Sequence, residues 1–189
     1  MLDVRKMKRI DLIFGILILV FLSSCAEKDT NFLISNDKIG KLDKISLVRD
    51  LELIYEGDSI VKDTMRSRVG SRTKKIKVYE KGGKHLLTLT PSADSIPTVE
   101  NISIEDPRFQ TESGIGIKST FKDIQAQYEI KKVVTTLNSV VIFPKGSNLY
   151  FTIDKSELPA NLRYTTSDID AVQIPNEAKL KYLMMGWEQ

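Results

Sequence analysis

The sequence predicts an α+β fold of two tandem repeats, each a helix followed by antiparallel strands that include a hairpin, with one shared core. The first observation is that residues 76–90 align without a gap on residues 140–154, and both segments alternate apolar residues around a Lys-Gly turn. The second is that a helical pattern precedes each segment. One such unit cannot bury its apolar face well alone, so two packed units are expected.

A helix is expected ahead of each hairpin. Thr120 and Asp123 have the spacing of a capping box at the start of the second helix, and Ser46 is the candidate cap of the first. Apolar residues then recur on one face of each helix: Val48, Leu51 and Tyr55, and Phe121, Ile124 and Tyr128. Ser46, Asp50 and Tyr55 have the same spacing as Ser119, Asp123 and Tyr128. This repeated spacing favours duplication over coincidence.

Strands are expected in the rest of each repeat. Each hairpin turn contains a glycine, Gly82 or Gly146, which supplies the positive φ that a tight turn needs. The strands expected outside the hairpins are 59–63, 130–135, a matched pair at 99–104 and 169–174, and a closing strand at 179–187. Each repeat is therefore expected to hold three or four antiparallel strands.

The only cysteine, Cys25, follows an apolar run from Leu12 to Leu22 that is itself preceded by four basic residues. This order is typical of a secretory signal. The sequence Leu22-Ser23-Ser24-Cys25 resembles the lipobox of bacterial lipoproteins, which implies cleavage before Cys25 and acylation of its thiol and new amino terminus, as in palmitate-bearing lipoproteins. A transmembrane helix is the alternative, but eleven residues span only about 16 Å, roughly half of a bilayer core.

The expected organisation is a signal peptide (1–24), a lipidated tether (25–31), a first repeat (32–106) and a second repeat (107–189). Acyl chains on Cys25 would hold the protein in the membrane of the cell envelope. Ala26 and Glu27 follow the lipid site, and resemblance to the sorting rule of enterobacterial lipoproteins favours the outer membrane. The leaflet and orientation stay open.

Composition narrows the classes of function. Removal of the signal takes away four basic and two acidic residues, so the net charge falls from +3 to +1 and no nucleic acid partner is indicated. No second cysteine is present, so the mature domain has no disulfide and depends on its core. An envelope protein partner is expected, and a small-molecule ligand stays unknown.

A basic stretch is the sharpest local charge feature, and two interpretations of it stay open. Its residues are Arg66, Arg68, Arg72, Lys74, Lys75 and Lys77. They could contact anionic lipid headgroups, lipopolysaccharide or an acidic partner. A mobile, solvated connection before the first hairpin is the interpretation that we favour, because isolated charge runs commonly have no partner.

Candidate chemical groups are few. Glu100, Glu105, Asp106 and Glu112 form the densest acidic stretch, and we favour solvated strand positions for them over a glycosidase-like pair. His85, the sole histidine, is expected on the surface or half-buried on a strand.

We therefore expect no enzyme, catalytic residue, metal or cofactor. A lipid-anchored binding or scaffold module is the expected function, and an envelope hydrolase acting on glycan or peptide through carboxylates near Glu105–Glu112 is the alternative.

Residues 109–124 carry a family resemblance. Phe109, Thr111, Gly114, Ile115, Ser119, Thr120, Asp123 and Ile124 match a motif of uncharacterised bacterial envelope lipoproteins, whereas Lys118 replaces its second glycine. Together with the duplication, the chain resembles the YfeY-like lipoprotein family and similar lipoproteins of Bacteroidota. The resemblance implies a tandem α+β repeat with no established enzymatic activity.

Overall fold

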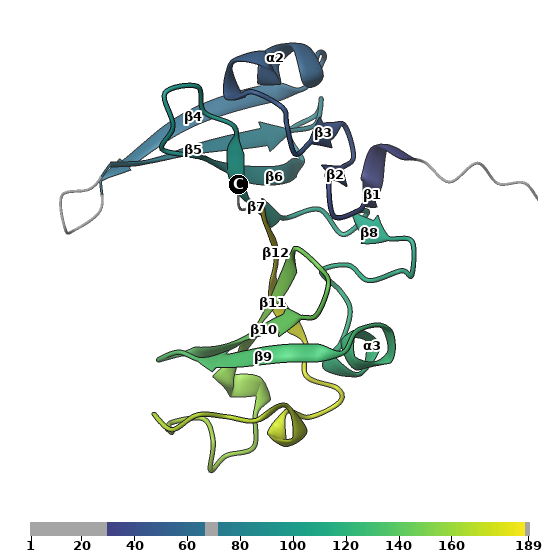
Figure 1. Cartoon of the computed structure of the whole chain (residues 1–189), viewed down its shortest axis with the longest axis vertical. Helices are drawn as coiled ribbons and strands as arrows, with labels where there is room; N and C mark the ends of the chain where they lie inside the picture. The colour runs from purple at the N-terminus through teal and green to yellow at the C-terminus, as the bar shows by residue number, and fades with distance from the viewer. Residues whose placement is uncertain (1–29, 67–71, 188–189) are drawn as a thin grey trace, which may run out of the picture. The chain divides into compact units, whose positions relative to one another are not determined.

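The computed structural model describes residues 30–66 and 72–187, and the compact unit that begins at Asn31 holds nearly all of them. Cys25 and Arg68 lie outside the described residues. The unit is an α+β fold dominated by two sheets, with few and short helices in its described part (Figure 1). The predicted fold class is confirmed at this level.

The smaller sheet has four two-residue strands in the order β3-β2-β1-β8: β1 (Leu33–Ile34), β2 (Lys38–Ile39), β3 (Leu42–Asp43) and β8 (Gln110–Thr111). The larger sheet has eight strands in the order β4-β5-β6-β7-β12-β11-β10-β9. Its strands are β4 (Ser59–Arg66), β5 (Arg72–Tyr79), β6 (His85–Pro91), β7 (Val99–Ile104), β9 (Ile130–Thr135), β10 (Ser139–Pro144), β11 (Leu149–Asp154) and β12 (Leu180–Gly186). All of its neighbouring strands are antiparallel.

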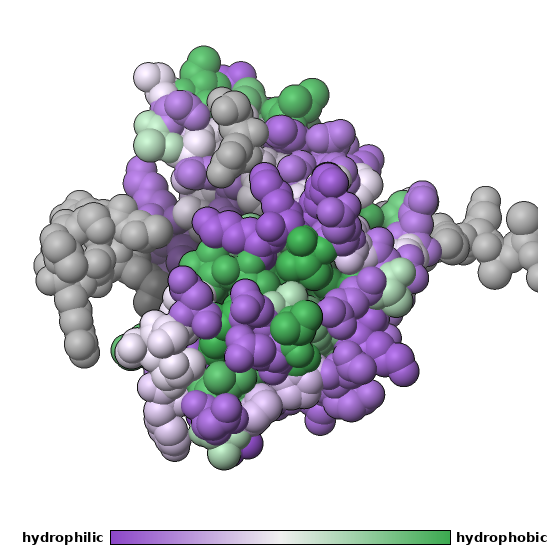
Figure 2. All heavy atoms as spheres, turned by 60° about the horizontal axis from the view of Figure 1, so that its bottom comes forward, coloured by the Kyte–Doolittle hydropathy of each residue, from purple (hydrophilic) through white to green (hydrophobic). Residues whose placement is uncertain are grey.

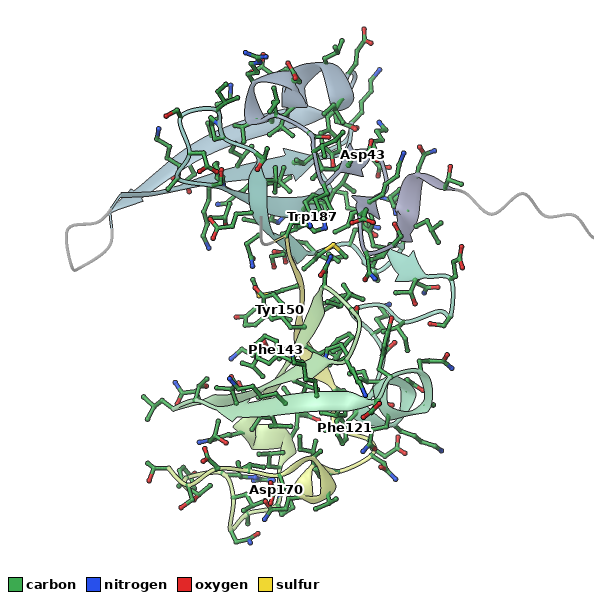
Figure 3. The ribbon with its side chains drawn as sticks, in the orientation of Figure 1. Asp43, Phe121, Phe143, Tyr150, Asp170 and Trp187 are labelled. Carbon is green, nitrogen blue, oxygen red and sulfur yellow. The ribbon has the colours of Figure 1, made fainter. Side chains whose placement is uncertain are left out.

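The described residues also form α2 (Leu51–Ile54) and α3 (Phe121–Gln127). The 3-10 helices among them are η1 (Thr30–Phe32), η2 (Val48–Asp50), η3 (Lys155–Glu157) and η4 (Ala171–Gln173). Residues from both α-helices and from both sheets form a single hydrophobic core. Phe121, fully buried, lies between α3 and the sheet (Figure 3).

The two hairpins pair their strands in matching registers. Ile76 pairs with Leu89 in β5–β6, and Val140, which aligns with Ile76 in the sequence, pairs with Ile153 in β10–β11. The turns contain Gly82 (φ +110°) and Gly146 (φ +70°), as the sequence predicts, because a left-handed backbone favours glycine. The large sheet consists of two groups of four strands, β4 to β7 (the first group) and β9 to β12 (the second group). Strand β7 pairs with β12 and thereby joins the two groups into one sheet.

Parallel contacts also precede the two helices. Asp43 N donates to Ser46 Oγ (3.2 Å), and Gly116 N donates to Ser119 Oγ (3.1 Å) in the same spacing. Thr120 and Asp123 form the predicted capping box of α3. Ser46 does not cap a helix, because the first helical region begins after Leu47 as η2 and continues as α2. That part of the prediction is wrong.

Two further predictions are corrected. Residues 169–174 are not a strand, because Asp170 and Gln173 form a capping box around the 3-10 turn η4, and Pro175, which has no N–H for a sheet, follows. The last strand of the second group is β12, within the predicted closing strand 179–187. Arg72 to Lys77 are part of strand β5 and pair with β4, so they are not a solvated connection.

The small sheet is tied to the end of the chain. The indole of Trp187 is buried and its Nε1 donates to Asn36 O (2.8 Å) (Figure 3). Asn36 also bonds Gly146 and Asn148 in the β10–β11 turn. These bonds fasten the β1–β2 turn to the large sheet.

Candidate functional site

An open groove of about 930 Å³ lies at one end of the first group of strands. Its walls come from η2, from β4 and β5, and from the connection between β6 and β7, residues 92–98. The apolar part of its lining is Leu47, Val48, Ile76, Pro91, Ala93, Ile96 and Pro97. Ile96 is 62% exposed on the connection, so the groove carries apolar surface accessible to a partner.

The strand wall of the groove is basic. Lys62 pairs with Ile76 across β4–β5, and Lys74 lies two positions before Ile76, so both lysines lie on the face of the hairpin that holds buried Ile76. Lys75 also lines the groove. Lys62 contacts Glu52 at 2.7 Å. Lys74 and Lys75 form no ion pair with a carboxylate among the described residues, so their charges are available to a ligand.

The connection wall carries the opposite sign. Asp94 lines the groove there, whereas Glu100 lines it from β7 and Asp63 from β4. Asp63 also forms an ion pair with Lys77 (3.4 Å). Lys77, a member of the predicted basic stretch, is therefore already paired within the chain. The groove therefore combines an apolar floor with a basic wall and a more acidic rim. This arrangement can hold an amphipathic ligand in one orientation.

The predicted anionic-contact residues are only partly brought together. Lys74 and Lys75 line the groove, whereas Lys77 is engaged with Asp63. Arg66 and Arg72 are paired backbone positions at the far end of β4–β5. No single motif in the sequence indicates the groove. The sequence feature that corresponds to it is a difference in length: the connection between β6 and β7 (92–98) is much shorter than the region between β11 and β12 (155–179).

The acidic stretch does not form a shared site. Asp106 is fully buried and contacts Arg108 Nη2 (2.7 Å) and Lys84 Nζ (3.0 Å), so the solvated interpretation is wrong for this residue. Glu105 is exposed and accepts a bond from Thr88 (3.3 Å). Glu112 is exposed, and neither residue lines the groove.

The charge on Asp106 is held by its partners. Burial acts to raise the pKa of Asp106, but hydrogen bonds from Arg108 and Lys84 outweigh it and lower the pKa to about 2. Arg108 also makes two bonds to Glu80 and lies 4.1 Å from the centre of the Phe32 ring. The cluster joins the β5–β6 turn to η1 and is structural in character.

His85 is half-buried on β6, as predicted. Its ring stacks on Tyr79 with centroids 4.7 Å apart, and its Nε2 lies 3.1 Å from Thr88 Oγ1. Thr88 Oγ1 also lies 3.3 Å from Glu105 Oε1, so the three side chains form one small hydrogen-bonded group. No group of three or more metal-ligating side chains occurs in the described part of the chain.

An aromatic pair lies on the face of the large sheet opposite to the core. Phe143 and Tyr150 stack with centroids 5.5 Å apart (Figure 3), and Asn101 Nδ2 donates to Tyr150 Oη. Tyr182 is 46% exposed on β12, and its neighbour in register, Thr152, is buried. Figure 2 shows one face of the molecule, on which hydrophobic residues gather among hydrophilic ones.

The described residues form an α+β unit with an open groove, and comparison with solved structures gives the same fold. The chain is similar to the uncharacterised protein YfeY from Escherichia coli, with a TM-score of 0.56 and 12% identity over 81% of this chain and 98% of that chain. At this identity the likeness shows the fold alone. No protein-family model matches the sequence, and no curated protein matches it. Within the described residues, no helix is long and apolar enough to span a membrane.

Proposed function

We propose that the chain is a lipid-anchored cell-envelope protein whose folded unit is a non-catalytic binding or scaffold module. The groove beside β4 and β5 carries the proposal, because it joins an apolar floor of residues such as Ile76 to the charges of Lys74 and Lys75. A surface of this kind gives a partner both hydrophobic contact and a charge that fixes its orientation.

The anchor is Cys25, at the end of the apolar run Leu12–Leu22. Thr30, the first described residue, comes five positions later, which is at most about 17 Å of extended chain. The folded unit would therefore work close to the bilayer. More than one acyl chain holds a protein stably in a membrane, and the residues after Cys25 favour the outer membrane.

We also infer that the unit arose by duplication and that it belongs with the YfeY-like lipoproteins. Hydrogen bonds and strand registers recur at matching positions of the two groups, as at Ser46 and Ser119 and at Ile76 and Val140. The likeness to YfeY, which covers 98% of that chain, supports a shared architecture.

A variant of the lipid site tests the anchor. Cys25→Ser should remain unprocessed or leave the detergent-extractable membrane fraction, because serine has no thiol to acylate. Globomycin, which blocks cleavage of lipoprotein signals, should cause the same change in mobility in the wild type. Ser24→Ala is a matched control that keeps a small residue before the cleavage point. Unaltered membrane association and mobility of Cys25→Ser would remove the assignment.

A further inference from the structure

We propose that the groove binds a short apolar segment of a partner polypeptide that carries flanking carboxylates. The proposal rests on the binding function proposed above and names the class of partner. It comes from comparing the two groups of strands, because the second group fills the corresponding place with its own residues.

The surroundings of the groove recur in the second group. Val48 N donates to Pro97 O (2.9 Å) beside the groove, and Phe121 N, at the matching position, donates to Ala178 O (2.9 Å). Leu47 forms an isolated bridge with Thr98, and Thr120 forms one with Lys179. The start of each helix is therefore fastened in the same way to the chain that leads into β7 or β12.

The long connection 155–179 occupies this place in the second group. Ile169 N donates to Thr135 Oγ1 (2.9 Å), and Thr135 corresponds to groove residue Lys62. Lys122 N donates to Asn176 O (2.9 Å), and Lys122 corresponds to groove residue Arg49.

The same connection adds buried apolar residues. Ile169 and Ile174, on either side of η4, are 2% and 4% exposed and belong to the core. In the first group, the short connection 92–98 cannot supply such a segment, and the groove stays open.

The groove in the first group differs in charge from the corresponding place in the second group, which the connection 155–179 fills. Lys62 stands where the second group has Thr135, and Lys74 stands where it has Asn138. A hydroxyl and an amide suit an intramolecular segment. Lys62 is paired with Glu52, but Lys74 has no ion-pair partner among the described residues and can attract a carboxylate from a separate molecule. Asp168 and Asp170 flank buried Ile169 and are exposed, so a segment of this pattern would bring carboxylates to the lysine wall. Polypeptide is favoured over lipid because the filled copy holds a polypeptide there.

The test uses a fluorescent peptide with the sequence of residues 166–175 (TSDIDAVQIP) and the full chain purified in mild detergent. We expect saturable binding by anisotropy at low salt. The double variant Lys74→Glu/Lys75→Glu should weaken it at least tenfold. The matched variant Lys131→Glu/Lys132→Glu changes two exposed lysines of β9 outside the groove and should change it less than twofold. Peptides with Ser in place of Ile169 and Ile174, or Asn in place of Asp168 and Asp170, should each bind at least tenfold more weakly.

Several results would overturn the proposal. The absence of binding at millimolar peptide would do so. Equal loss of peptide affinity in Lys74→Glu/Lys75→Glu and in Lys131→Glu/Lys132→Glu would also do so, because it would indicate general charge attraction. Binding of vesicles with anionic phospholipid, lost in Lys74→Glu/Lys75→Glu while the peptide does not bind, would assign the groove to a lipid surface instead. Membrane attachment through Cys25 is measured separately, so failure here leaves the anchor intact.

Discussion

Arg108 Nη2 lies 2.7 Å from Asp106 Oδ2, and the carboxylate of Asp106 is fully buried. A buried carboxylate keeps its charge only while its cation stays in place. Removal of the Asp106 carboxylate takes a buried acceptor from Lys84 and from Arg108, which is 37% exposed and keeps its two bonds to Glu80.

Asp106→Asn should therefore lower the free energy of unfolding by about 2 kcal/mol, because it removes the hydrogen bonds that the buried carboxylate accepts from charged groups. Urea unfolding of the full chain in detergent measures the change. Asp43→Asn is the control, because Asp43 contacts Lys38 at 3.6 Å with both side chains about half exposed, and exposed pairs contribute less than about 1 kcal/mol. Equal stability of Asp106→Asn and the wild type would show that the network is dispensable.

Stability should also fall in acid through this group. The folded pKa of Asp106 is about 2, below the unfolded value near 3.8, because the bonds from Arg108 and Lys84 outweigh burial. The stabilisation is complete above about pH 4 and is lost as the pH falls toward 2, where the folded state must also take up the proton. Unfolding midpoints from pH 5 to pH 2 should fall less steeply for Asp106→Asn. Parallel curves for both proteins would contradict this prediction.

Tyr55 offers a stabilising substitution. Its hydroxyl is buried and has no hydrogen-bond partner among the described residues, and burial raises its pKa above the ordinary range. Tyr55→Phe should raise the free energy of unfolding by about 1 kcal/mol, because it removes an unsatisfied polar group. Thermal unfolding measures the gain, with Tyr128→Phe at the half-buried corresponding position as a near-neutral control. A lower melting temperature for Tyr55→Phe would mean that the hydroxyl is bonded.

Two glycines should differ in their tolerance of alanine. A Cβ on Gly116 would lie 2.7 Å from Phe109 O, a backbone atom, whereas one on Gly186 would lie 3.7 Å from Tyr150 Cε1. Gly116→Ala should cost about 1–3 kcal/mol through overpacking, and Gly186→Ala, in strand β12, should be neutral or slightly stabilising. Chemical unfolding of both variants is the measurement. An unchanged free energy of unfolding for Gly116→Ala would show that the backbone near Phe109 can shift to accommodate the added methyl group at little cost.

Local patterns in the sequence were sufficient for the hairpins and for α3. Alternation, turn glycines and the Thr120–Asp123 spacing act over short stretches of chain, so they can be identified without the fold. Strand β12 pairs with β7, which lies far earlier in the chain, and the competing match at 169–174 has similar apolar spacing but packs as a 3-10 turn. The burial of Asp106 depends on Lys84 and Arg108, which only the folded β5–β6 turn brings together.

The groove was not predicted, because it arises from what one connection lacks relative to the other. Lys74 and Lys75 belong to the predicted basic stretch, but Lys62 does not, and only the strand pairing separates Lys74 from Lys77. The unequal lengths of the connections 92–98 and 155–179 would have been the signal, once β7 and β12 were matched.

The bond from Trp187 to Asn36 joins positions 151 residues apart in the chain. Contacts of such long sequence separation slow folding, since a large loop must close before they form. The unit can complete its core only when residue 187 is available, so in a chain exported from its N-terminus the residues up to 187 would cross the membrane before folding is complete. For the lipoprotein proposed here, attachment of the N-terminus would then come first, and the domain would fold while already confined to the bilayer surface.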